Sequence, residues 1–152
     1  MISGSGLPDP VLALQRATHR TLYTLTATLA DLSLSAAEIN ALANLGEGGT
    51  LNVRQLSERT GTRASTLTGL LDRLENRGYL TREQDPGDRR SFRLPLTEAG
   101  QAVASRVLTA IADLERDALS RLSADQIAGY HAVITALQEA ADAPPRRSAP
   151  PA

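Results

Sequence analysis

The segment that decides the fold runs from Val53 to Gly100 and reads VRQLSERTGTRASTLTGLLDRLENRGYLTREQDPGDRRSFRLPLTEAG. Its first half predicts a short helix over 52–60, a turn at Gly61 and a second helix over 62–77, because glycine readily ends a helix. Its second half predicts a β-hairpin, since a turn-forming Asp-Pro-Gly-Asp sequence separates two short strands. The segment therefore predicts a helix-turn-helix followed by a hairpin.

The second helix of this pair has two different faces when its residues are placed 100° apart. One face is apolar and carries Leu67, Leu70, Leu71 and Leu74. The opposite face is small and polar and carries Ser65, Thr66, Gly69, Arg73 and Asn76. Such a face suits the DNA major groove, and the helix N-terminus at Thr62 and Arg63 favours phosphate. A solvated surface helix of a bundle would show the same pattern.

The hairpin places two arginines, Arg89 and Arg90, at the tip of a turn, with Arg82 and Arg93 lower on the strands. An arginine on a narrow ribbon has the right size to enter a minor groove, where the negative potential is concentrated. Asp88 is close enough in sequence to brace one of the guanidinium groups. A solvated charged turn is the alternative interpretation of the hairpin alone.

The returning strand of the hairpin predicts one apolar face. Phe92, Leu94 and Leu96 alternate with polar residues or proline over this stretch. Pro95 cannot donate a ladder hydrogen bond, so the strand should lie at an edge or end there.

The net charge of −1 hides an uneven distribution. Residues 1–49 hold two arginines against four acids, and residues 94–152 hold five against seven, so each end carries −2. Residues 50–93 hold nine arginines against six acids, a local +3. The basic part of the chain therefore coincides with the helix-turn-helix and the hairpin, as expected of a nucleic-acid-binding surface.

Long helices are predicted on both sides of this segment. From Pro10 an apolar stripe with steps of three and four residues predicts a helix over 10–33, with Val11, Leu14, Thr18, Leu22, Leu25, Leu29 and Leu32. Ser35 and Glu38 form a capping box for a helix that ends near Gly46, and two more helices follow over 97–119 and after Ser123. We expect one domain over 10–142, a flexible start over 1–9 and a disordered proline-rich tail over 143–152.

Composition excludes several kinds of site and of protein. The chain has no cysteine, so disulfides, thiolate metal sites and cysteine-based redox sensing are excluded. The histidines His19 and His131 are too few for a usual zinc site, and we expect no metal and no cofactor. No leader and no apolar run of the ~20 residues that span a membrane is present, which favours a cytoplasmic protein. No glycine-rich phosphate loop or Ser-His-Asp set suggests an enzyme.

The segment from Val53 to Gly100 resembles the MarR family of bacterial transcriptional regulators. The features that carry the resemblance are Leu56, Leu67-Thr68, Leu71-Asp72-Arg73-Leu74-Glu75, Gly78, Asp85-Pro86, Asp88-Arg89-Arg90, Leu96-Thr97 and Gly100. The resemblance implies a mainly α fold with a small β-hairpin wing, in which residues 35–97 form a winged helix-turn-helix lobe. It implies that the helix up to Arg77 reads DNA, that Arg73 anchors the DNA backbone, and that Arg89 and Arg90 enter the minor groove.

The resemblance also implies a homodimer built by the helices over 10–33 and 98–142, which would cover the long apolar stripe of the first helix. A repressor that binds a pseudo-palindromic double-stranded operator follows from it, with a small aromatic or anionic effector that weakens DNA binding. Candidate effector ligands are Arg16, His19, Arg20 and Tyr23, and the favoured alternative is that they are solvated polar positions on a long helix or form dimer salt bridges. The rival function is a winged-helix module that binds protein without an operator.

Overall fold

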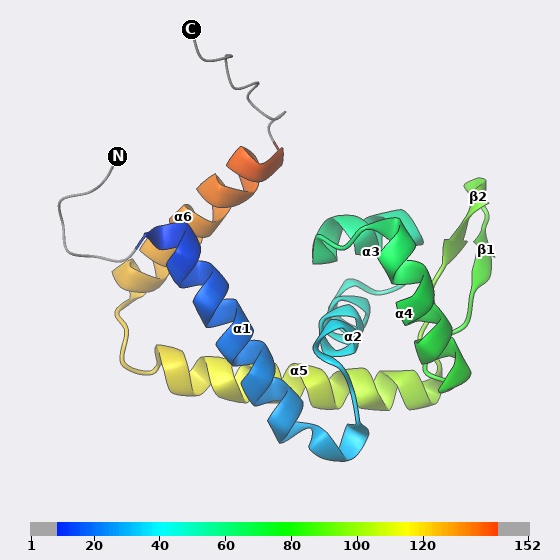
Figure 1. The fold of residues 1–152 in the computed structure, drawn as a ribbon, viewed down its shortest axis with the longest axis horizontal. Coiled ribbons are helices and arrows are strands. Elements are labelled where there is room, and N and C mark those ends of the chain that lie inside the picture. The colour runs from blue at the N-terminus through cyan, green and yellow to red at the C-terminus, as the bar shows by residue number, and fades with distance from the viewer. Residues whose placement is uncertain (1–8, 143–152) are drawn as a thin grey trace, which may run out of the picture.

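The computed structural model describes residues 9–142 and confirms a mainly helical fold with one two-stranded hairpin in this range (Figure 1). The elements are, in chain order, α1 (Pro10–Thr28), the 3₁₀ turn η1 (Ala30–Leu32), α2 (Ala36–Gly48), α3 (Val53–Thr60), α4 (Ala64–Asn76), β1 (Glu83–Asp85), β2 (Asp88–Arg93), α5 (Glu98–Leu119) and α6 (Ala124–Asp142). The tail predicted over 143–152 and all but the last residue of the flexible start lie outside the described residues.

The molecule has a lobe and an arm, and the arm consists of α1 and α6 (Figure 1). Helix α5 joins the two parts. The lobe holds α2, α3, α4 and the hairpin, and its core is mostly leucine, with Leu42, Leu56 and Leu67 fully buried. The first half of α5 completes this core through Val103 and Val107, whereas its second half runs out of the lobe toward α1 and α6. None of the helices in the described range is long and apolar enough to cross a membrane.

The first helix is shorter than the predicted range of 10–33. It ends at Thr28, and the chain continues through the 3₁₀ turn to Ser33, which adopts a left-handed conformation with φ 48°. The reason is that Leu29 and Leu34 both turn into the core, which a continuous helix could not achieve. Only the end of the apolar stripe is therefore covered by the lobe, and Val11 is still 47% exposed.

The helix-turn-helix forms as predicted, with shorter limits for its second helix. Asn52 and Gln55 build a capping box at the start of α3, and Gly61 ends that helix with φ 64°, where a side chain would be strained. Helix α4 begins at residue 64 instead of 62, because Arg63 is extended and the Thr62 carbonyl accepts a hydrogen bond from Ser57 Oγ. The four leucines of α4 are buried, which confirms its predicted apolar face.

The hairpin is shorter and less regular than predicted. Gln84 pairs with Phe92, but the register shifts at Asp85, which pairs with Asp88. The strand ends at Arg93, before Pro95. The predicted apolar face is wrong for Phe92, which is 45% exposed, whereas Leu94 turns inward and its amide donates to the Leu51 carbonyl.

The start of α5 approaches the backbone of Tyr79 so closely that only glycine fits there. A Cβ on Gly100 would lie 1.7 Å from the Tyr79 carbonyl oxygen. Thr97 caps α5 by accepting from Gly100 N, and its own amide donates to the same Tyr79 oxygen. This contact fixes α5 against the end of α4 and thereby orients the lobe.

Candidate nucleic-acid interface

The polar face of α4 is exposed, as the sequence predicts. Ser65, Thr66, Gly69 and Arg73 all lie on the surface, opposite the buried leucines. Arg63 is also exposed at the helix start, but Thr62 is half-buried in the turn before α4. The predicted recognition residues therefore share one surface, with Thr62 at its less accessible edge.

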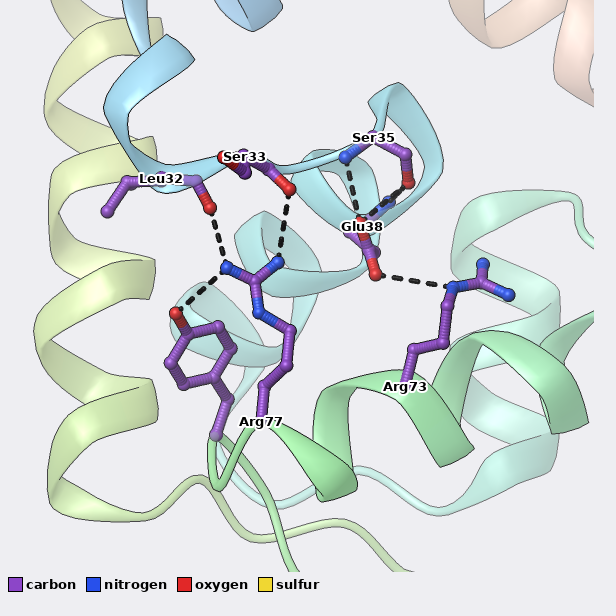
Figure 2. Close-up of polar contacts among 7 residues, drawn as sticks. Leu32, Ser33, Ser35, Glu38, Arg73 and Arg77 are labelled. Atoms are coloured by element: carbon purple, nitrogen blue, oxygen red, sulfur yellow. Dashed lines mark hydrogen bonds and ion pairs between the residues drawn. The ribbon is translucent and has the colours of Figure 1, made fainter.

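Arg73 on α4 contacts the carboxylate of Glu38 on α2, a residue that the sequence predicts only as part of a helix cap. Its Nε lies 3.4 Å from Oε1 of Glu38 at the start of α2 (Figure 2). The second carboxylate oxygen of Glu38 accepts from the backbone amide and the hydroxyl of Ser35, at 2.8 and 2.9 Å. Burial alone would raise the pKa of the Glu38 carboxyl, but the Ser35 hydrogen bonds and the Arg73 guanidinium outweigh it and lower the pKa below 4.5.

Arg77 ties the end of α4 to the turn between α1 and α2. Its guanidinium donates to the carbonyl of Leu32 at 2.6 Å and to that of Ser33 at 3.2 Å (Figure 2). It also donates to the Tyr79 hydroxyl and lies 4.9 Å from the centre of that ring. Arg77 is thus a structural contact between the end of α4 and the turn that follows α1, which no sequence pattern indicated.

The wing presents Arg89 and Arg90 on its surface, as predicted, but the expected role of Asp88 is wrong. The Asp88 carboxylate accepts a hydrogen bond from the backbone amide of Arg90 at 2.9 Å and pairs with no guanidinium in the described chain. A carboxylate two residues before an amide forms this short loop readily. Asp88 therefore braces the backbone of the wing tip. Gln84 adds a second brace by donating to the Arg89 carbonyl.

Arg82 does not join the other wing arginines on an open surface. It bridges the wing to α4 through ion pairs with Asp72 at 2.6 Å and Glu75 at 2.7 Å. Asp72 and Glu75 are three residues apart and therefore lie on one side of α4. This spacing was the sequence pattern that could have indicated a shared basic partner. The bridge connects the wing to α4.

The candidate effector residues on α1 lie together but form no enclosed site in one chain. Arg16, His19 and Arg20 line an open hollow of about 370 Å³, whereas Tyr23 lies outside it and is 78% exposed. His19 Nδ1 lies 2.7 Å from the Gln15 carbonyl oxygen and donates to it, so Nε2 is the nitrogen left for a ligand. Among the described residues, no three acidic or histidine side chains are grouped to hold a metal.

Comparison with known sequences identifies relatives of the lobe. The sequence profile of the MarR family matches residues 30–91. The HTH-type transcriptional regulator PecS of Dickeya dadantii is 40% identical over 96 residues, which are 61% of this chain and 58% of PecS. SarZ of Staphylococcus aureus, another HTH-type transcriptional regulator, is 40% identical over 55 residues, 36% of this chain and 37% of SarZ. The chain thus matches little more than half the length of these curated relatives at most.

Solved structures extend the similarity to the arm. PcaV of Streptomyces coelicolor, a transcriptional regulator solved with its natural ligand, is 29% identical with a TM-score of 0.72, covering 93% of this chain and all of PcaV. NadR in complex with 4-hydroxyphenylacetate shares the fold with a TM-score of 0.78 at 20% identity, covering 91% and 98%. The segment over residues 30–91 thus matches the MarR family, and the fold of these solved structures is shared along nearly the whole chain.

Proposed function

We propose that the chain is a DNA-binding transcriptional regulator that binds a pseudo-palindromic operator as a homodimer and acts as a repressor in the cytoplasm. The observation that carries this proposal is the single surface shared by the polar face of α4 and the arginine-bearing wing. Helix α4 has the small side chains that allow close approach to base edges in the major groove. Arg89 and Arg90 lie on a ribbon narrow enough for the adjacent minor groove.

The dimer is proposed from apolar surface that one chain leaves uncovered. No residue of α6 is buried, and its Tyr130 and Val133 are 55% and 48% exposed. Val11 and Leu12 on α1 are exposed to a similar degree, and both helices belong to the arm that projects from the lobe (Figure 1). A second copy would bury these faces against its own arm, and two lobes would then meet two half-sites of DNA.

An anionic aromatic effector is proposed for the hollow on α1. Arg16 and Arg20 supply two guanidinium groups one turn apart, which suit a carboxylate, and His19 Nε2 can bond a phenol. Tyr23 would join the site only if the second copy closes over it. The solved complexes of PcaV and NadR support an effector, since both contain a ligand. We expect 4-hydroxyphenylacetate, used as a probe, to raise the melting temperature and Arg16→Ala with Arg20→Ala to abolish that rise.

The decisive experiment selects bound sequences from random DNA and then measures affinity across a range of salt concentrations. Arg89→Ala with Arg90→Ala should weaken binding by about 1–3 kcal/mol for each arginine that contacts DNA and flatten the salt dependence. The matched control is Arg116→Ala with Arg121→Ala, which removes the same charge from exposed positions in the part of α5 that lies outside the lobe and in the loop after it. Light scattering on each variant checks that the dimer is retained.

The outcomes separate the proposal from its rival. Absence of any selected sequence at low salt would favour a winged-helix module that binds protein. Equal losses from both pairs of substitutions would mean that the wing contributes only general charge. A wild-type monomer at micromolar concentration would refute the proposed dimer.

A further inference from the structure

The side chain of Arg73 is held at one nitrogen and open at the other two. Its Nε faces Glu38, while the terminal nitrogens point away from that carboxylate (Figure 2). One of them, Nη1, lies 3.9 Å from the position that a Cβ on Gly69 would take, so the guanidinium extends over the polar face of α4. The side chain is 58% exposed. Arg73 therefore presents its fork on the surface that we assign to DNA.

The side chain of Glu38 is buried and held in place, whereas the arginine that it contacts is exposed. Its side chain is only 6% exposed, and Ser35 occupies one of its two carboxylate oxygens. The remaining oxygen faces α4 and its only recorded partner in the described chain is Arg73. The lowered pKa of Glu38 keeps the carboxylate charged at neutral pH. A buried and charged acceptor with little rotational freedom can orient an arginine, as a solvated acid cannot.

We propose that Glu38 is a positioning residue for DNA binding, which holds Arg73 by Nε and directs its terminal nitrogens to a phosphate of the DNA backbone. The proposal rests on the proposed function, because it needs α4 to lie against DNA. A guanidinium offers five donors in a planar fork, so one can be used by a carboxylate while the others bind phosphate. The ordering of a long side chain then takes place in the free protein and does not oppose DNA binding.

The test is Glu38→Gln, measured on the operator selected by the wild-type protein. Glutamine keeps an oxygen for the amide of Ser35 and therefore keeps the helix cap, but it lacks the charge that holds Arg73. We expect affinity to fall about threefold to tenfold, the range of a charge-assisted contact. Removal of an acid near DNA would by itself strengthen binding, so a loss identifies positioning. Glu47→Gln is the matched control, since Glu47 is an exposed acid on the same helix and should not weaken binding.

Two further variants show whether Glu38 acts through Arg73. In an Arg73→Ala background, Glu38→Gln should cause no additional loss, because the group that it positions is absent. Arg73→Lys keeps the charge on α4 but has no Nε, and it should lose at least as much affinity as Glu38→Gln. Because this variant leaves Glu38 and the helix cap in place, it tests the proposal even if Glu38→Gln unfolds.

The results distinguish this proposal from the function on which it rests. A wild-type protein that selects no DNA refutes the proposed function. A wild-type protein that binds DNA, with Glu38→Gln binding as tightly or more tightly, leaves the function intact and refutes the positioning role. Additive losses from Glu38→Gln and Arg73→Ala would likewise refute it, as would wild-type affinity in Arg73→Lys.

Discussion

Replacement of Gly100 by alanine should destabilise the protein strongly, because the new Cβ has no room. It would lie 1.7 Å from the oxygen and 2.6 Å from the carbon of the Tyr79 carbonyl. Both atoms are backbone, so no side chain can rotate away, and α5 must shift by roughly 1.5 Å to restore an ordinary C···O contact of about 3.3 Å.

The cost can be worked out from three contributions. Overpacking costs about 1–3 kcal/mol. The shift also weakens the bond from the Thr97 amide to the Tyr79 oxygen, and a lost hydrogen bond costs roughly 1 kcal/mol. Against these, alanine gains about 1 kcal/mol over glycine inside a helix. We therefore expect a net loss of about 1–3 kcal/mol, or a melting temperature lower by roughly 2–12 °C for a chain of this size.

Equilibrium unfolding in urea, at one fixed protein concentration, measures this loss. Gly69→Ala is the control, because Gly69 also lies inside a helix but its nearest neighbour would be 3.9 Å from the new Cβ. That change should stabilise the protein by roughly 0.5–1 kcal/mol. If Gly100→Ala unfolds at the same urea concentration as the wild type, the close approach of α5 to Tyr79 is not a constraint on this fold.

Two more perturbations follow from the polar contacts of α4. The lowered pKa of Glu38 stabilises the fold above its ordinary value of 4.5, and this contribution is lost as the pH falls through the lowered pKa. Between pH 6 and about pH 3 the wild type should thus lose more unfolding free energy than Glu38→Gln, and parallel pH curves would contradict this. Arg82→Met should cost about 1 kcal/mol, since its side chain is only 25% exposed between Asp72 and Glu75. It should also speed proteolysis within the wing, and unchanged cleavage would mean that the bridge does not hold the wing.

The parts of the fold that the sequence predicts are those set by neighbours in the chain. The leucines of α4 repeat every three or four residues, and the capping box at Ser35 spans three residues. Such patterns need no knowledge of the rest of the molecule. They were sufficient to locate the lobe, the turn at Gly61 and the exposed face of α4.

The parts that the sequence analysis missed depend on residues far apart in the chain. Arg73 meets Glu38 across 35 positions, and Arg77 meets the Leu32 carbonyl across 45. Phe92 shares the alternation of Leu94 and Leu96, but it is 45% exposed, whereas Leu94 is buried and Leu96 packs against the core. The end of α1 at Thr28 has the same origin, since the apolar stripe continues to Leu32 while the backbone turns into the core. Periodicity reports a face but not the point at which tertiary packing interrupts it.

The net charge of the lobe understates the number of arginines that it could offer to DNA in the proposed function. Of the nine arginines in residues 50–93, Arg54, Arg73 and Arg82 contact carboxylates and Arg77 donates to backbone carbonyls. The others have no acidic partner in the described part of the chain: Arg59, Arg63, Arg89, Arg90 and Arg93.

An arginine whose terminal nitrogens already pair with carboxylates, such as Arg82, binds phosphate at the expense of those ion pairs, whereas an unpaired arginine adds a contact. DNA affinity falls with salt by a slope of roughly −0.9 for each phosphate neutralised, so the slope counts contacts and does not follow net charge. The net charge of +3 in residues 50–93 therefore sets no upper limit on the slope of DNA affinity against salt concentration. A slope steeper than the net charge allows would show that the unpaired arginines of the wing and of the α4 start act individually.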